Sequence, residues 1–208
     1  MTTGGTIPRF LLWVTLVVAT VGGGPRAAAQ APGDAQRGRA LFTAKGCAGC
    51  HLPQGQQGAG PALEELRKPQ GGFELSGRLW NHTPGMFATL QREGKPWPTF
   101  TAAEMADLMV YLRAEPARDP AVNLALGQAL LVRKGCLKCH QFRGEGGWVG
   151  IELTKYHGGY ESPVVWATAV WNHAPRMAVE GRWKGLLYPR FSGEEMANLV
   201  GFLRSAVK

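Results

Sequence analysis

Residues 47–51 read Cys-Ala-Gly-Cys-His, and residues 136–140 read Cys-Leu-Lys-Cys-His. These two stretches contain all 4 cysteines of the 208-residue chain. A Cys-x-x-Cys-His motif is typical of c-type haem attachment, in which the two thiols bond covalently to the porphyrin and the histidine binds the iron. We therefore predict two haem c groups. The residues predicted to hold them are Cys47, Cys50 and His51 for the first haem, and Cys136, Cys139 and His140 for the second.

A zinc site is the alternative for cysteine pairs next to histidine, because zinc takes sulfur and nitrogen ligands in a tetrahedron. The sequence before each motif argues against zinc. Residues 38–46 read Gly-Arg-Ala-Leu-Phe-Thr-Ala-Lys-Gly, and residues 127–135 read Gly-Gln-Ala-Leu-Leu-Val-Arg-Lys-Gly. The flanks are thus repeated along with the motifs, and a single zinc ion would leave that repetition unexplained.

The two halves also share their signals for helix ends. Asp34 and Asn123 are candidate N-caps of helices that run up to the glycine before each motif. Capping boxes at residues 101–104 and 192–195 predict a closing helix in each half. Apolar side chains follow each box at helical spacing, which predicts that they belong to the core. They are Met105, Leu108, Met109 and Leu112 in the first half, and Met196, Leu199, Val200 and Leu203 in the second.

This repetition predicts two tandem domains, at residues 34–115 and 123–208. Residues 116–122 contain two prolines and alternating charge, which is typical of a linker. The duplication of one small module explains both the spacing and the order of the signals.

The first 29 residues have the pattern of a secretory signal peptide. Arg9 precedes an apolar run over residues 10–21, and three alanines at residues 27–29 predict cleavage after Ala29. An uncleaved membrane anchor is the alternative, although the apolar run is short for a membrane span. We therefore expect a periplasmic or otherwise exported protein.

The charge of the chain bears on its partners. The formal net charge of +8 at pH 7 stays positive after Arg9 and Arg26 are removed with the signal peptide. Nucleic acid is not expected as a partner of an exported protein without a basic run. A positive surface favours an acidic redox protein as the partner, and a surface that is simply solvated is the alternative. The sequence leaves the oligomeric state open.

Each half contains, in the same order, a helix, Cys-x-x-Cys-His, a glycine-rich loop, a middle helix, Pro-x-Phe and a closing helix. This order resembles the class I cytochrome c family over nearly the whole chain after the signal peptide. The resemblance implies an all-α fold class with two tandem class I cytochrome c-like domains, each wrapped around one covalent haem c. In the family, a Gly-Pro-x-Leu carbonyl accepts a hydrogen bond from the proximal histidine. Residues 60–63 match that motif, whereas residues 150–153 read Gly-Ile-Glu-Leu.

The distal ligand is where the chain departs from the family. Class I cytochromes present a methionine just before Pro-x-Phe, but Trp97 and Tyr188 occupy that position here. Neither ring is expected to bind iron, and we predict that both pack on the haem or cover its pocket.

A replacement ligand should lie upstream and be repeated. Residues 80–86 read Trp-Asn-His-Thr-Pro-Gly-Met, and residues 171–177 read Trp-Asn-His-Ala-Pro-Arg-Met. The histidine and the methionine of each copy lie on one face of a helix, and either can bind haem iron. We favour Met86 and Met177 as distal ligands, with His82 and His173 as the alternative. The prolines between them are expected to start or kink the helix.

These features predict an exported dihaem cytochrome c that carries electrons between a donor and an acceptor in the periplasm or membrane, rather than an enzyme. A dihaem oxidoreductase or peroxidase-like enzyme is the alternative, and it would need an open distal position at one haem. An electron-transfer subunit of a larger complex is a further alternative. His157 has no counterpart in the first half, and we expect a surface or propionate-contacting role for it.

Overall fold

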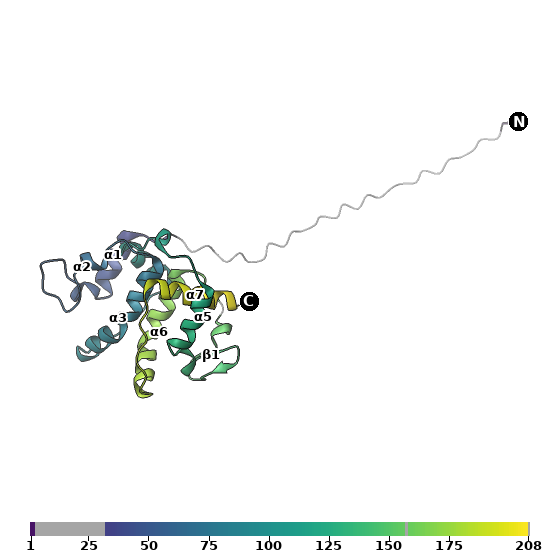
Figure 1. Ribbon diagram of the computed structural model, residues 1–208. Helices are drawn as coiled ribbons and strands as arrows, with labels where there is room; N and C mark the ends of the chain where they lie inside the picture. Colours follow the sequence, from purple (N-terminus) through teal and green to yellow (C-terminus); the bar gives the residue numbers. More distant parts are fainter. Residues whose placement is uncertain (3–31, 157, 208) are drawn as a thin grey trace. The chain divides into compact units, whose positions relative to one another are not determined.

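The structure is a computed structural model, and it describes residues 1–2, 32–156 and 158–207. The predicted signal peptide therefore lies almost entirely outside the described residues, as does His157. Residues 32 onward belong to one compact, mostly helical unit (Figure 1). No helix in the described ranges has both the length and the apolar character needed to cross a membrane.

The same succession of helices occurs in both halves of this unit. The first half contains α1 (Ala35–Ala44), the short helix η1 (Cys47–Gly49), α2 (Leu63–Leu66), α3 (Gly72–Arg92) and α4 (Ala102–Tyr111). The connection contains η2 (Pro116–Arg118). The second half contains α5 (Leu124–Arg133), η3 (Cys136–Lys138), strands β1 (Gln141–Phe142) and β2 (Glu145–Gly146), η4 (Leu153–Lys155), α6 (Pro163–Trp183) and α7 (Gly193–Ala206).

The helix caps predicted from the sequence are confirmed. The Asp34 side chain accepts a hydrogen bond from the Arg37 amide, and the Asn123 side chain accepts one from the Leu126 amide. Both capping boxes are present at the starts of α4 and α7. All eight apolar residues predicted behind these boxes are buried. The local signals in the sequence thus set the helix ends and the core faces in both halves.

In each half the first helix packs against the closing helix, α1 on α4 and α5 on α7. The two helices approach so closely that a Cβ atom at Gly38 would lie 2.1 Å from the Asp107 carbonyl oxygen. A Cβ atom at Gly127 would lie 2.1 Å from the Asn198 carbonyl oxygen. The repeated glycines before the haem motifs are therefore required by helix packing.

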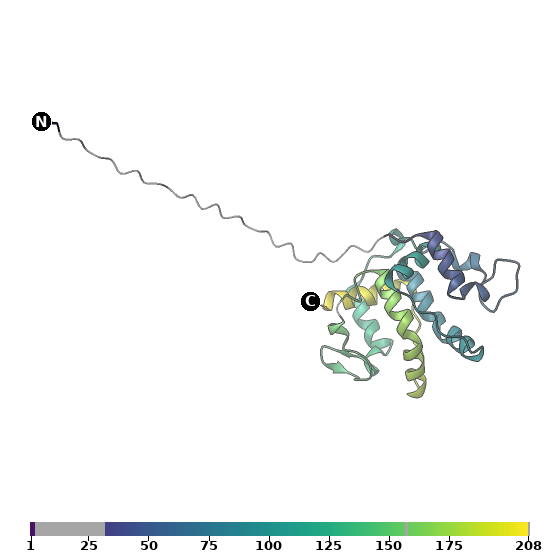
Figure 2. The same cartoon turned by 180° about the vertical axis from the view of Figure 1, so that it is seen from behind.

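The middle helices α3 and α6 lie side by side and join the two halves (Figures 1 and 2). The core of the first half includes Ala167 and Trp171 from α6. The core of the second half includes Trp80 from α3. Each half therefore completes its hydrophobic core with side chains from the other.

Three details go beyond the sequence-based picture. Pro84 and Pro175 lie inside α3 and α6, which excludes the alternative that they start these helices and leaves the alternative that they kink them. The second half adds a short antiparallel hairpin to the helices, because Arg143 and Gly144 both adopt positive φ angles and form its turn. The predicted linker is not a free tether, since the Asp119 carboxylate accepts a hydrogen bond from the Phe73 amide at the start of α3.

Candidate haem sites

The first predicted attachment motif begins where α1 ends. Gly46 has a φ of 83°, a conformation that glycine adopts without strain, and the chain then turns into η1 with Cys47 at its start. His51 is buried, and its Nδ1 lies 3.0 Å from the Pro61 carbonyl oxygen. A carbonyl can only accept, so Nδ1 carries the proton and Nε2 is left with a lone pair for a metal.

The second motif has the same geometry without the proline. Gly135 has a φ of 75°, and the His140 Nδ1 lies 3.0 Å from the Ile151 carbonyl oxygen. The proline is therefore not needed for this contact. A Cβ atom at Gly60 would lie 2.5 Å from the His51 ring, and one at Gly150 would lie 2.4 Å from the His140 ring. In both sites the loop backbone passes directly against the imidazole and fixes its orientation.

A cavity lies beside each motif. The first has a volume of about 260 Å³ and the second about 1050 Å³. Both are lined mainly by apolar side chains. The predicted ligands that line the first cavity are Cys47, His51, His82 and Met86. Those that line the second are Cys136, Cys139, His140, His173 and Met177.

These residues fit a covalently held haem. The four cysteines form no disulfide. Burial raises the pKa of the Cys47 and Cys136 thiols to about 11, so both are neutral at ordinary pH. Two thiols, a histidine nitrogen with a free lone pair and an apolar cavity are what a haem c group requires. When bound, haem supplies an iron that alternates between its ferrous and ferric states.

The histidine of each repeated distal segment lines the same cavity as the proximal histidine. The His51 and His82 rings have centroids 5.7 Å apart. Burial, and then the proximity of His51, lower the pKa of His82 below its ordinary value. Burial and the proximity of His140 likewise lower the pKa of His173. A lowered pKa favours the neutral form of both distal histidines, which is the form that binds metals. Met86 and Met177 pack on the two cores beside them, and the prediction that they bind the iron stays a prediction.

The repeated Trp-Asn pair before each distal histidine makes contacts that the sequence did not predict. The Trp171 Nε1 donates to the Pro98 carbonyl at 2.7 Å, across from one half to the other. The Asn172 amide donates to the Phe100 carbonyl at 2.8 Å and accepts from the Phe100 amide at 3.0 Å. The segment beside the second distal histidine thus binds the loop of the first site.

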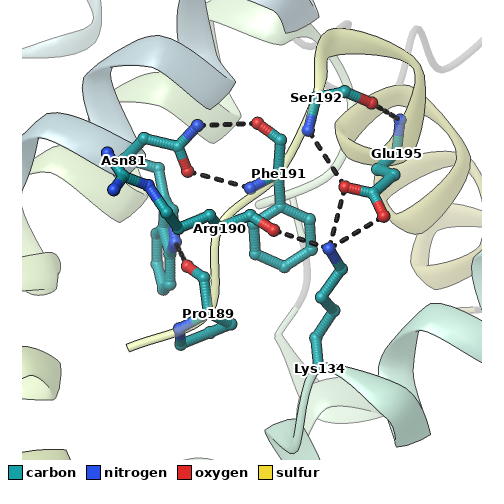
Figure 3. Close-up of polar contacts among 8 residues, drawn as sticks. Asn81, Lys134, Pro189, Arg190, Phe191, Ser192 and Glu195 are labelled. Atoms are coloured by element: carbon teal, nitrogen blue, oxygen red, sulfur yellow. Dashed lines mark hydrogen bonds and ion pairs between the residues drawn. The ribbon is translucent and has the colours of Figure 1, made fainter. Parts of the chain in front are cut away.

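The reciprocal contact occurs at the second site. The Trp80 Nε1 donates to the Pro189 carbonyl at 2.6 Å. The Asn81 side chain donates to the Phe191 carbonyl at 2.7 Å and accepts from the Phe191 amide at 2.8 Å (Figure 3). The only signal in the sequence was that Trp-Asn is repeated, and that signal does not say which half each copy contacts.

Each loop is also held by a lysine from its own half. The Lys134 Nζ donates to the Arg190 carbonyl at 2.6 Å and pairs with Glu195 at 2.8 Å (Figure 3). In the first half the Lys45 Nζ donates to the Thr99 carbonyl at 2.8 Å and pairs with Glu104 at 3.0 Å. The loop that contains Pro-x-Phe is therefore fixed from both sides in each half.

The aromatic residues that replace the loop methionine lie at this same boundary. Tyr188 lines the second cavity and stacks on Trp80 with ring centroids 4.8 Å apart. Trp97 packs on Trp171 with ring centroids 4.4 Å apart, and the Trp97 Nε1 donates a hydrogen bond to the Trp171 carbonyl. Both rings therefore contact the opposite half, and of the two only Tyr188 lines a cavity as predicted.

Residues 35–115 match the family model described as Cytochrome c. The match covers the first candidate site, and it supports an electron-transfer haem protein in which haem c is bound covalently. A search of the curated proteins finds no match. In the described ranges, no group of three or more histidine, cysteine, aspartate or glutamate side chains could hold a bare metal ion.

Proposed function

Starting from the similarity of residues 35–115 to cytochrome c, we propose that the chain is an exported electron-transfer protein with two haem c groups. The observation that carries the proposal is the repetition of the whole site. Each half has a cysteine pair without a disulfide, and it places at least one of these cysteines and the proximal histidine against an apolar cavity. In each half the Nδ1 of that histidine lies 3.0 Å from a backbone carbonyl. Residues 123–208 would then be the second cytochrome domain.

We further propose that His82 and His173 are the distal ligands, in place of the methionines that the sequence favours. The 5.7 Å between the His51 and His82 ring centroids supports this. At this separation both imidazoles could hold one metal ion, because a metal–nitrogen bond is about 2 Å long. His173 is included because its segment repeats that of His82. Ligation by two histidines would give a lower reduction potential than ligation by histidine and methionine.

The proposed location and partner follow from the sequence. Residues 1–29 would direct export and be removed after Ala29. Exposed basic side chains next to the second cavity favour an acidic redox partner, through electrostatic steering of the encounter. Arg133, Lys138 and Arg176 line this cavity and are exposed, and Glu180 is the one acidic residue beside them in its lining.

Haem content and ligation test the proposal directly. The purified protein should contain two covalently bound haems per chain, measured by mass spectrometry and by the pyridine haemochrome assay. Cys136→Ala combined with Cys139→Ala should leave one. The near-infrared charge-transfer band of a sulfur–iron bond should be absent from the oxidised protein, and His82→Ala should convert the first haem to high spin. A content of one haem per chain would contradict the proposal of two haem c groups. A sulfur–iron band that is lost in Met86→Ala would contradict the proposal that His82 is the distal ligand.

A haem enzyme is the second candidate, and one observation favours it. The second cavity is larger than the first, and His173 is exposed while His82 is half-buried. A distal ligand with this exposure is easier to displace by a substrate such as peroxide. Turnover of peroxide that is abolished by Cys136→Ala combined with Cys139→Ala, and retained when Cys47→Ala is combined with Cys50→Ala, would favour the enzyme. Absence of turnover together with fast electron exchange would favour the carrier.

A further inference from the structure

Each repeated Trp-Asn pair lies next to the distal histidine of one candidate site and contacts the loop of the other. Asn172 is adjacent in sequence to His173, which lines the second cavity. Its side chain, however, pairs with both backbone polar groups of Phe100, which lines the first cavity. Trp171 itself lines the first cavity although it lies on α6.

The same crossing occurs in the opposite direction. Asn81 is adjacent to His82 of the first cavity, and its side chain pairs with both backbone polar groups of Phe191, which lines the second cavity (Figure 3). Trp80 lines the second cavity from α3. A carboxamide has one acceptor and one donor group in a fixed plane, so asparagine is suited to bind the N–H and the C=O of one residue together.

We infer that Asn172 and Trp171 are positioning residues for the first haem, and that Asn81 and Trp80 are positioning residues for the second. Each half thereby fixes a wall of the haem pocket in the other half. This inference rests on the proposed function. Walls of a haem pocket control solvent access and the local dielectric, and both tune the reduction potential of the iron.

Phe100 and Phe191, the residues whose backbone groups pair with the asparagines, are both buried. Phe100 is 4% exposed and Phe191 is 5% exposed. If the asparagine is truncated, the amide and carbonyl of such a residue lose their partners in a place that water reaches poorly, which is unfavourable. The loop must then shift or open to solvent. Because the loop is a pocket wall, the change reaches the haem that the loop covers.

The test is a pair of variants, Asn172→Ala and Asn81→Ala, in the holoprotein. The two haems are distinguished by their EPR signals, assigned from the signal that is lost in His82→Ala or in His173→Ala. Redox titration of Asn172→Ala should change the reduction equilibrium of the first haem by at least threefold, about 28 mV for one electron. The second haem should change by less than half as much. Asn81→Ala should give the mirror result.

Amide exchange, followed by NMR in the fully reduced protein, reports on the clamp separately. Asn172→Ala should raise the exchange rate of the Phe100 amide about tenfold and leave the Phe191 amide unchanged. Lys45→Met is the control from the same half, because Lys45 holds the Thr99 carbonyl of the same loop from α1. It should affect the first haem and spare the second.

A shift that falls on the second haem in Asn172→Ala, or a Phe100 amide that stays protected, would overturn the inference. Failure of the proposed function is recognised independently, by a haem content other than two per chain. In that case the exchange measurement still decides whether the clamp exists, since it depends on the backbone of Phe100 and not on the ligand of the iron.

Discussion

The two halves use the same framework around sites that differ in size and exposure. Asp34 and Asn123 cap equivalent helices, and Lys45 and Lys134 hold equivalent loops. In contrast, the first cavity of about 260 Å³ is the smaller, and the second reaches about 1050 Å³. His51 is buried, whereas His140 is half-buried.

The residues that differ lie at the sites. The carbonyl that accepts a hydrogen bond from the proximal histidine belongs to Pro61 in the first half and to Ile151 in the second. Arg190 of the second half lines the first cavity, and its counterpart in the first half is Thr99. Helix packing constrains the framework in both copies, while the cavities are free to diverge. On the proposal that each site holds a haem, this divergence would give the two haems different reduction potentials.

Separating the halves should give the largest effect. Fragments 32–122 and 123–208 should each fail to fold alone, because each core is completed by the other half. The measurement is haem retention and far-ultraviolet circular dichroism of each fragment, against the two fragments produced together, which should associate. A single fragment that keeps its haem and unfolds cooperatively at the temperature of the full chain would show that the halves are independent.

Trp171→Ala should give the next largest effect. Trp171 is 4% exposed in the core of the first half, and it also donates to the Pro98 carbonyl. Truncation of a buried aromatic costs about 3–5 kcal/mol, so the free energy of unfolding in urea should fall by that amount. Circular dichroism and haem absorbance should report one common transition. The matched variant Trp97→Ala removes a half-buried ring at the same contact and should cost less. Equal losses would contradict this account.

Arg190→Thr should reduce the difference between the sites. Arg190 and Arg78 both line the first cavity, and a nearby positive charge favours the ferrous iron, which carries one positive charge fewer. The reduction equilibrium of the first haem should shift about threefold toward the oxidised form, near 28 mV for one electron. The converse variant Thr99→Arg should raise the potential of the second haem. Spectroelectrochemistry measures both, and a lower potential of the second haem in Arg190→Thr would refute the assignment.

Local features were predictable from the sequence because they depend on neighbouring residues. The caps at Asp34 and Asn123, the capping boxes and the buried stripes of α4 and α7 all follow from spacing alone. The repeated order of elements also predicted that each cysteine motif and its distal segment belong to one site, and in each half residues of both line one cavity. The prediction of two haem-binding sites thus came from repeats that are visible in the linear sequence.

Contacts across the two halves were not predictable in this way. A Trp-Asn pair beside a histidine indicates nothing about which loop it binds, because the partner of Asn172 is Phe100 in the other half. The sequence also left open whether Pro84 starts or kinks its helix, because proline removes a helix hydrogen bond in either position. In the structure it lies inside α3, which packs against α6. Long-range pairing of this kind is decided by the packed structure.

Asp107→Asn should give the smallest change in stability. It places in the first half the residue type that the second half has at the equivalent position, Asn198. Asp107 accepts from the Asp34 amide at 2.7 Å, as Asn198 accepts from the Asn123 amide at 2.7 Å. Asp107 also pairs with Arg37, and this hydrogen bond lowers the pKa of its carboxyl below the usual range. A lowered folded-state pKa stabilises the fold above the unfolded pKa of about 3.9, and that contribution is lost as the pH falls through the folded value.

The variant keeps the Oδ1 acceptor for the Asp34 amide, and it removes both the negative charge and the Oδ2 acceptor of the Arg37 Nε–H. The contact with Arg37 is weak because the Arg37 side chain is 63% exposed. Wild type should therefore be slightly more stable than Asp107→Asn at neutral pH and equal to it in strong acid. Urea unfolding at a series of pH values measures the difference. Asn198→Asp is the matched control in the second half, where no arginine stands at the position of Arg37, since Leu126 occupies it. A stability difference that persists unchanged into strong acid would show that the pair acts through packing instead of charge.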